Sequence, residues 1–212
     1  MYKKDAFKTI KKAGLAGLGG GFVMSFSFIA FVFAMMNTSV ANVVFIISTQ
    51  TMFLAIFGYF YLKEKVSIIG LLSIILAMMG ITVMIGDSIS GGTLFGNLVA
   101  LTIPVSFSIL VMIIRKNNNL DLVPAIWYAS ISSTLISFLM INDLSFTNND
   151  ILMGFLLGVP QLTFGFVCIT IGSRTTKSVT IGLLMLTETI FAPLWVWLFL
   201  NEIPPMSVFI GG

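Results

Sequence analysis

The chain has 212 residues, of which 58% are hydrophobic and 9% are charged, with a net charge of +3. This composition, with a mean hydropathy of +1.07, excludes an ordinary soluble domain and indicates an integral membrane protein. There is no histidine and a single cysteine, which excludes a histidine-based catalytic triad, a Cys/His metal cluster and a disulfide framework within one chain. We expect neither an enzyme nor a bound cofactor.

Charge-free runs predict seven complete transmembrane helices, each about as long as the ~20 residues that a bilayer core requires. Asn37, Thr38 and Ser39 divide the first run, which is too long for one helix. An eighth helix begins at Pro204 and is incomplete at Gly212. We therefore expect an all-α integral membrane protein, a polytopic helical bundle. The seven complete helices cover residues 13–36, 39–62, 66–86, 94–114, 122–141, 151–173 and 178–200.

The basic residues predict how the chain is oriented. If successive helices alternate in direction, all 11 lysines and arginines lie on one side of the membrane. The positive-inside rule makes that side cytoplasmic, together with the N-terminus and a short basic lead at residues 1–12. The pI of about 9.1 then reflects topology rather than nucleic-acid binding. We expect the plasma membrane as the location.

The first predicted helix is rich in glycine and includes the GxxxG pair Gly17 and Gly21. Two interpretations stay open: close packing against another helix, or a half-helix that flexes or unwinds beside a cavity. Further along, Ser67 and Asp121 are expected N-caps of the third and fifth helices, and Pro124 lies in the first turn of the fifth.

The second predicted helix carries two side-chain amides, Asn42 and Gln50. Unlike hydroxyls, which can return their hydrogen bonds to the same helix, amides need partners elsewhere. Both side chains should therefore face inward. Each is either a packing contact between helices or a contact for a substrate.

The sixth predicted helix has a stripe of small residues interrupted by one amide. Its members recur at spacings of three and four: Gly154, Gly158, Gln161, Gly165, Cys168 and Gly172. Such a stripe predicts close contact with another helix or with a cavity. Pro160 directly precedes Gln161, so we expect a bend where the amide points. Gln161 is a candidate for the substrate site.

The seventh predicted helix carries a carboxylate, Glu188, at its midpoint, where a membrane rarely tolerates one without a function. Its face also includes Ile181, Leu184, Phe191 and Trp195 at helical spacing. A neutral Glu188 could simply donate a hydrogen bond to a neighbouring helix. The functional alternatives are contact with a polar or cationic substrate and proton coupling, of which we favour substrate contact. Trp195 belongs either to an aromatic cavity wall or to an interfacial belt.

Residues 38–64 and 176–202 follow the same plan, which predicts an internal repeat. Each has a hydroxyl-rich entrance, a polar patch at mid-length, an apolar exit and then Leu-x-Glu. An offset of 138 residues (202 − 64) places Glu64 over Glu202 and Gln50 over Glu188. The second and seventh helices run in opposite directions, so the architecture is an inverted repeat of the kind found in secondary transporters. Residues 13–86 form the remainder of the first repeat, and residues 94–212 form the second, with its last helix incomplete.

Three stretches resemble the drug/metabolite transporter superfamily, specifically its EamA-like permeases: TSVANVVFIISTQTMFLAIFGYFYLKEKVSIIGLLSIILAMMGI, GNLVALTIPVSFSILVMIIRK and LLMLTETIFAPLWVWLFLNEIPPMSVFIGG. The resemblance implies two inverted five-helix repeats around a central cavity, of which this chain looks like helices three to nine and the start of ten. It also implies that Glu188 is the mid-helix acid of the penultimate helix. Thr189 stands where a proline often follows that acid. The resemblance implies solute transport and names no solute.

Together these features predict a secondary carrier that moves a small metabolite or drug-like solute by alternating access. No phosphate-binding loop for direct use of ATP is present. The alternative is a non-transporting membrane scaffold or assembly subunit. A carrier should have a polar, solvent-reachable cavity around Gln161 and Glu188, whereas a scaffold should bury both in direct contacts.

The expected partners are the lipid bilayer, a small-molecule substrate and a second copy of the chain in a homodimer, and no nucleic acid is expected. The candidate substrate-binding residues are Asn42, Gln50, Gln161, Glu188 and Trp195.

Overall fold

The computed structural model describes residues 6–38, 40–85, 94–140, 145, 147–200, 206 and 210. Every regular element within these residues is helical, so the predicted all-α class is confirmed. Helix is present at each of the seven predicted positions, whereas the predicted eighth helix lies almost entirely outside the described residues. The elements are α1 (Ala6–Asn37), α2 (Val40–Ser48), α3 (Gln50–Leu62), α4 (Ile68–Ile85), α5 (Leu94–Lys116), α6 (Pro124–Met140), α7 (Asn148–Leu156), the π-helix η2 (Leu157–Thr163), α8 (Phe164–Gly172) and α9 (Ser178–Leu200).

Four of the described helical segments are long and apolar enough to cross a membrane: Thr9–Asn37, Asn42–Leu62, Leu94–Lys116 and Asn148–Gly172. Three shorter apolar segments accompany them: Ile68–Val83, Pro124–Met140 and Ser178–Thr189. With the composition, these segments identify an integral membrane protein. The count of seven spans stays a prediction.

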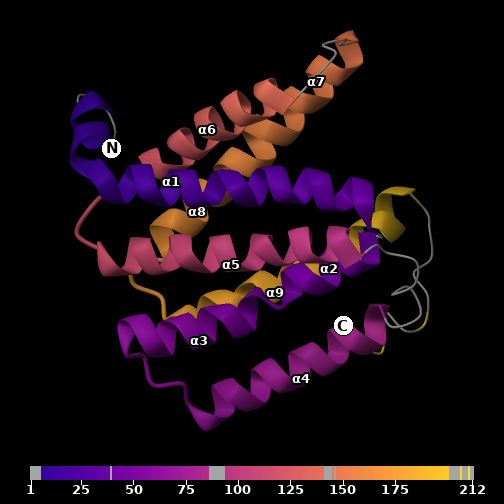
Figure 1. Cartoon of the computed structure of the whole chain (residues 1–212). Helices are drawn as coiled ribbons and strands as arrows, with labels where there is room; N and C mark the ends of the chain where they lie inside the picture. The colour runs from indigo at the N-terminus through magenta and orange to yellow at the C-terminus, as the bar shows by residue number, and fades with distance from the viewer. Residues whose placement is uncertain are drawn as a thin grey trace.

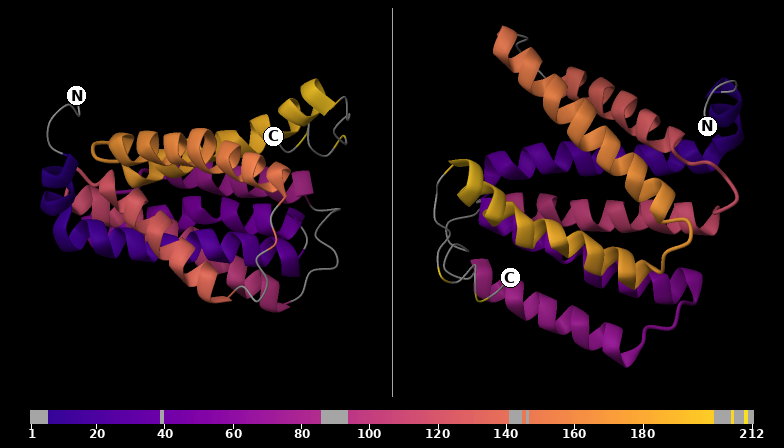
Figure 2. Two further views of the ribbon diagram at one scale, coloured as in Figure 1. Left: turned by 90° about the horizontal axis from the view of Figure 1, so that it is seen from above. Right: turned by 180° about the vertical axis from the view of Figure 1, so that it is seen from behind.

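The helices α6, α1, α5 and α3 lie side by side in that order, and α4 follows at the edge of the row, in contact with α2 and α9 (Figure 1). The span formed by α7, η2 and α8 crosses one face of this row, as does α9 (Figure 2). These two spans meet at residues 173–177 and diverge toward the other end of the molecule. The described chain is therefore a row of helices with a V of two spans lying across it.

The longest helix, α1, lies between α5 and α6 and packs closely against α6 through its glycines. A Cβ added to Gly21 would lie 2.5 Å from the carbonyl oxygen of Ala125 and 2.6 Å from the Cβ of Tyr128. The packing interpretation of the glycine-rich stretch is therefore confirmed for Gly21. Gly14 has a φ of 50°, which glycine adopts without steric cost, and α1 is kinked there.

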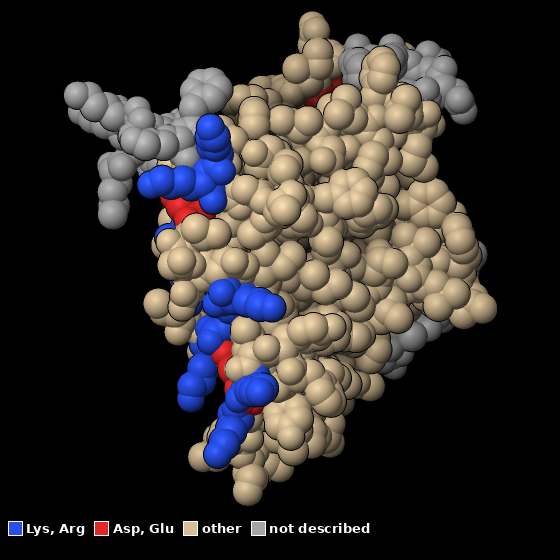
Figure 3. All heavy atoms as spheres, turned by 60° about the vertical axis from the view of Figure 1, so that its left-hand side comes forward, with Lys and Arg blue, Asp and Glu red and all other residues tan. Residues whose placement is uncertain are grey.

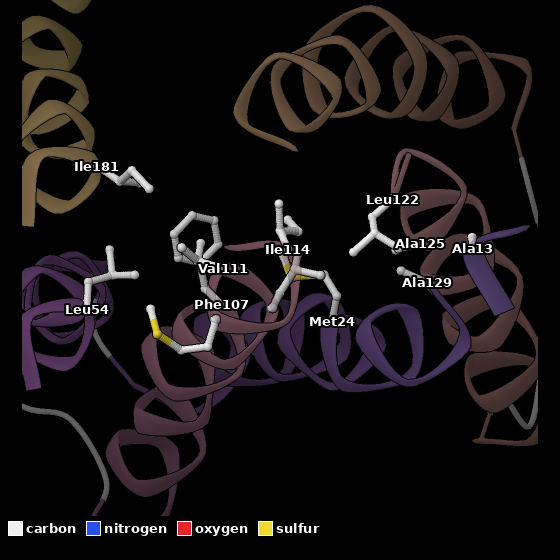
Figure 4. Close-up of a cluster of buried hydrophobic side chains, with 12 residues drawn as sticks. Ala13, Met24, Leu54, Phe107, Val111, Ile114, Leu122, Ala125, Ala129 and Ile181 are labelled. Carbon is white, nitrogen blue, oxygen red and sulfur yellow. The ribbon is translucent and has the colours of Figure 1, made fainter. Parts of the chain in front are cut away.

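The main core cluster joins five helices. Its buried side chains come from α1, α3, α5, α9, and α6 with the turn before it (Figure 4): Ala13, Met24, Leu54, Phe107, Leu110, Val111, Met112, Ile114, Leu122, Ala125, Ala129 and Ile181. A second cluster, in α1, α2 and α5, includes Ala34, Val43 and Ala100. Since lipid offers apolar surroundings too, this packing is stabilised mainly by close van der Waals contact rather than by exclusion of water.

Predicted caps and breaks are found where the sequence placed them. The Gly70 amide donates to the Ser67 hydroxyl at 3.0 Å, and the Val123 amide donates to an Asp121 carboxylate oxygen at 3.2 Å. The helix containing Pro160 widens into the π-helix η2 around it, because proline removes a backbone donor. A break that the sequence did not predict separates α2 from α3 at Thr49.

The basic residues whose side chains the structure describes all lie at one end of the bundle, called here the basic end. They flank the start of α1, the α3–α4 connection, the end of α5 and the α8–α9 connection: Lys11, Lys12, Lys63, Lys65, Arg115, Lys116, Arg174 and Lys177. Figure 3 shows the blue side chains gathered along one edge, with red acidic side chains between them, on a surface that is otherwise mostly tan. Asp150 lies in the first turn of α7, at the opposite end.

The stripe of small residues in the sixth predicted helix does not meet another helix within the described part of the chain. Added Cβ atoms on Gly154, Gly158, Gly165 and Gly172 would have no atom within 4 Å, and Cys168 is exposed. The prediction of close helix packing along this stripe was therefore wrong for the residues described. The physical reason is that small residues permit close approach but supply no partner.

Candidate functional site

Gln50 and Glu188 both lie in the middle part of the bundle. Gln50 is twelve residues from the end of α3 at the basic end, or about 18 Å along a helix. Glu188 is ten residues from the start of α9 at the same end, or about 15 Å. A hydrocarbon core is about 30 Å thick, so both side chains are near its middle.

The two helices that carry these residues pack against each other in opposite directions. The Thr51 hydroxyl donates to the carbonyl oxygen of Gly182 at 3.2 Å, and an added Cβ on Gly58 would lie 2.9 Å from that of Ser178. Residue numbers therefore rise along α3, from Thr51 to Gly58, while those of the facing residues on α9 fall, from Gly182 to Ser178. Gln50 and Glu188 therefore lie on adjacent antiparallel helices.

Glu188 is exposed within the described structure and forms no hydrogen bond or ion pair with another described residue. It follows Ile181 by seven residues, so both lie on the same face of α9. Ile181 is buried in the core cluster. The other members of this face, Leu184, Phe191 and Trp195, are exposed, so Glu188 lies on a face of α9 that is buried only near the basic end. Direct burial against another described helix, which a scaffold would require, is not found.

Gln50 is buried, with 6% of its surface exposed. It precedes Leu54 by one turn, and Leu54 belongs to the core cluster, so the amide faces the bundle. No hydrogen bond joins the amide to a described residue. Gln50 starts α3 directly after the break at Thr49. Interrupted helices of this kind flank the substrate sites of many secondary transporters.

Gln161 lies in η2 and is exposed, like its neighbours in that π-helix. The Thr163 hydroxyl returns its hydrogen bond to the carbonyl oxygen of Gly158 at 2.8 Å. A π-helix inside an α-helical span is frequent at functional sites. The structure therefore leaves the Gln161 amide on an open surface and does not bring it into contact with Gln50 or Glu188.

Asn42 takes part in a hydrogen-bonded cluster toward the opposite end. Its amide nitrogen donates to Thr38 Oγ1 at 3.1 Å and to Asn97 Oδ1 at 3.3 Å. The Thr38 hydroxyl donates to Asn97 Oδ1 at 2.7 Å. This cluster ties α2, the end of α1 and the start of α5 together. The geometry is that of a packing contact, one of the two alternatives raised for Asn42.

Trp195 is 54% exposed and lies seven residues beyond Glu188, toward the opposite end. Its ring contacts that of Phe199, with ring centroids 5.8 Å apart. Large aromatic side chains near a helix end suit the boundary between lipid and water. The structure thus places Trp195 about 10 Å from the level of Glu188 along the helix.

A groove of about 610 Å³ runs between α1 and α5. None of the five predicted residues lines it, and its walls are mainly apolar: Phe26, Ile29, Ala30, Phe33, Phe95, Leu98, Val99, Leu101, Thr102, Val105 and Ser106. The Thr102 hydroxyl is bonded back to the Val99 carbonyl at 2.7 Å. This groove therefore offers few polar contacts to a solute and is not the predicted site.

Two arrangements were not singled out from the sequence. Phe166 of α8 contacts Phe28 of α1 and Phe107 of α5, with ring centroids 5.4 and 6.4 Å apart. The other is the pairing of Glu64 with Arg115, both largely buried. The sequence contained a signal for the contact between Phe28 and Phe166, because these two residues are separated by the repeat offset of 138.

Comparisons with known proteins agree with this architecture. A model of the EamA-like transporter family matches residues 1–86 and 94–212. No match was found among curated proteins. A solved structure described only as "Crystal structure of protein" is similar to this chain, with a TM-score of 0.75 and 17% sequence identity. The matched region covers 93% of this chain and 70% of the chain in that structure. At that identity the similarity shows the fold alone.

Proposed function

Because the chain belongs to the EamA-like transporter family, we propose that it is a secondary carrier that moves a small metabolite or drug-like solute by alternating access. The observation that carries the proposal is the placement of Gln50 and Glu188 at mid-depth on adjacent antiparallel helices. An amide and a carboxylate at that depth can contact a polar or cationic solute that lipid would exclude.

An inverted repeat is part of this proposal, and the hydrogen bonds of Thr49 and Thr187 support it. These two residues are counterparts at the offset of 138. Each hydroxyl donates to the carbonyl oxygen three residues earlier, Thr49 at 2.5 Å and Thr187 at 2.6 Å. The antiparallel packing of α3 and α9 is the arrangement that inversion requires. Such symmetry makes inward-facing and outward-facing states nearly equivalent.

The contact between Phe28 and Phe166 gives the repeat a centre. Residues 25–28 read SFSF and residues 163–166 read TFGF, at the same offset. A residue that touches its own counterpart lies close to the axis relating the two copies. When the copies exchange conformations, a contact on that axis is conserved. We therefore assign Phe28 and Phe166, whose rings meet edge to face, to the pivot of the rocking motion.

Glu188 and Gln50 are the principal substrate contacts in this proposal. We favour substrate contact over proton coupling for Glu188. Gln161 would extend the site from η2, and Asn42 and Trp195 lie on the way to the opposite end. The hydrogen bonds of Asn42 to Thr38 and Asn97 make its part mainly structural.

Orientation is a further part of the proposal. The basic end is cytoplasmic by the positive-inside rule, and so is the N-terminus. The plasma membrane is the proposed location. The homodimer stays a prediction.

The proposal is tested by solute uptake into vesicles that contain the chain, with and without a pH gradient. A panel of small polar and cationic solutes is compared between the unaltered chain, Glu188→Gln and Asp150→Asn. We expect uptake of at least one solute above protein-free vesicles. Glu188→Gln should change which solutes are carried if the carboxylate contacts substrate, and should abolish uptake if it couples protons. Asp150→Asn, at the opposite end, should leave uptake unchanged.

Uptake equal to that of protein-free vesicles across the whole panel, with folded protein present, would favour the scaffold over the carrier. An unaltered solute profile in Glu188→Gln would remove Glu188 from the site.

A further inference from the structure

Glu64 joins three helices at the basic end. It follows the end of α3, where its amide donates to the Gly58 carbonyl at 3.0 Å. One carboxylate oxygen accepts a hydrogen bond from the Arg115 guanidinium at the end of α5. The other accepts from the backbone amide of Ser178, the first residue of α9, at 2.9 Å. We call Glu64, Arg115 and Ser178 the Glu64 latch.

The Glu64 latch depends on the close approach of α3 and α9. A Cβ on Gly58 would lie 2.9 Å from Ser178 Cβ and 3.1 Å from a Glu64 carboxylate oxygen. The absence of a side chain at Gly58 therefore lets the start of α9 reach Glu64. A carboxylate at a helix N-terminus is stabilised by the unpaired amides there.

A second ion pair lies at the same end. Arg174, between α8 and α9, pairs with Asp121, between α5 and α6. Its side chains are 26% and 30% exposed, against 15% and 13% for Arg115 and Glu64. Both ion pairs found within the described residues are thus at the basic end. Arg174 attaches the apex of the V, between α8 and α9, to the row of helices, and the V opens toward the other end (Figure 2).

The Glu64 latch is incompletely hydrogen-bonded. Arg115 Nε and Nη1 and the Ser178 hydroxyl are buried and have no partner among the described residues. A buried donor without a partner is destabilising, and a buried ion pair gains little over its loss of hydration. Water entering this end would hydrate these groups, which offsets the loss of the ion pair.

We propose that the Glu64 latch is the gate of the basic side, closed in this structure and open when the central site faces that side. This inference rests on the proposed carrier function and assigns its gating residues. The start of α9 would separate from α3 and α5, while the Phe28–Phe166 contact is kept.

A buried reporter at Ile181 tests the gate. Ile181 is 6% exposed and lies one turn inside Ser178. In a chain with Cys168→Ser and Ile181→Cys, a membrane-impermeant thiol reagent is added to each side of vesicles separately. Adding Glu64→Gln should raise the labelling rate from the basic side about tenfold, since losing the ion pair shifts the population toward the open state. Asp150→Asn, the matched loss of a carboxylate at the opposite end, should not change it.

A second variant of the Glu64 latch repeats the test. Arg115→Gln, in the same Cys168→Ser and Ile181→Cys chain, removes the other member of the ion pair and should also raise the labelling rate from the basic side. Thermal stability of each variant in detergent shows whether it is folded. An unchanged labelling rate in folded Glu64→Gln would overturn the gate. Uptake by the unaltered chain tests the carrier function separately, so the gate can fail while transport stands.

Discussion

α1 and the span of α7, η2 and α8, which correspond at the proposed repeat offset of 138, are packed differently. In α1, Gly21 lies against the backbone of α6, and Ala13, Met24 and Ala34 are buried. In the other span the glycines face open space, and α7 and η2 contain no buried residue among those described. The difference shows that a stripe of small residues allows a helix contact without creating one.

The physical reason lies in what surrounds each helix. α1 has α5 on one side and α6 on the other. Among the described residues, the span of α7, η2 and α8 is joined to the row only in its part nearest the basic end, by Phe166 and Ile169 of α8 and by Arg174. Because lipid is as apolar as a leucine side chain, an apolar face gains little by leaving lipid for another helix. Burial is therefore decided by available partners rather than by hydropathy.

The largest effect should come from filling the α1–α6 contact. Gly21→Ala places a methyl group against the Ala125 backbone and should destabilise the fold by about 2 kcal/mol, because the helices must separate. The loss of stability is measured by thermal denaturation in detergent, in which the monodisperse peak in size-exclusion chromatography is recorded after heating. Gly154→Ala is the matched control in α7 and should not lower the midpoint. Equal losses in the two variants would show that the two spans are packed alike.

A smaller loss is expected at the pivot. Phe166→Ala removes the ring between Phe28 and Phe107 and should lower stability by about 1 to 2 kcal/mol, less than for a fully buried phenylalanine. Phe164→Ala, two residues earlier and 69% exposed, is the control and should be nearly neutral. The same denaturation assay applies. If Phe164→Ala is as damaging as Phe166→Ala, then α8 is not anchored through Phe166.

The smallest effect concerns the free end of α7. Thr147 and Asp150 form a capping box there, and the backbone hydrogen bond from Thr147, followed by its side-chain bond, lowers the pKa of Asp150 below 3.8. A lowered pKa in the folded state stabilises the helix end above the ordinary pKa, and this contribution is lost as pH falls through the folded value. Asp150→Asn should speed amide hydrogen exchange at residues 148–151 at neutral pH. As pH falls through the folded-state pKa of Asp150, the variant and the unaltered chain should converge.

The sequence predicts most of the fold because membrane constraints act locally. Span positions follow from charge-free length, and the caps at Ser67 and Asp121 follow from the need of helix ends for acceptors. The stripe around Gly158 could not be interpreted in this way, since its partner is a property of the assembled bundle. The break at Thr49 was also missed, because a hydroxyl bonded to its own helix leaves no separate signal in the sequence.

The candidate site is predictable only in part for the same reason. Unusual polarity at mid-span singles out Gln50 and Glu188, and both lie in the middle part of the bundle on adjacent helices. The sequence alone does not show that Asn42 bonds to Thr38 and Asn97. Asn97 is far away in the chain, and Thr38 lies beyond the start of the helix that carries Asn42. The Glu64 latch likewise depends on partners that are distant in the sequence. Arg115 is 51 positions from Glu64, and Ser178 is 114 positions from it.

The most direct test of the account is whether Glu188 meets water at mid-depth. In a Cys168→Ser chain, Glu188→Cys is treated in vesicles with a charged, membrane-impermeant thiol reagent, and Leu76→Cys on α4, 71% exposed, serves as the control facing lipid. The account predicts that the cysteine at position 188 reacts at least about tenfold faster than the one at position 76, because thiolates form and charged reagents diffuse in water and not in hydrocarbon. Equal and negligible labelling of both cysteines would contradict it.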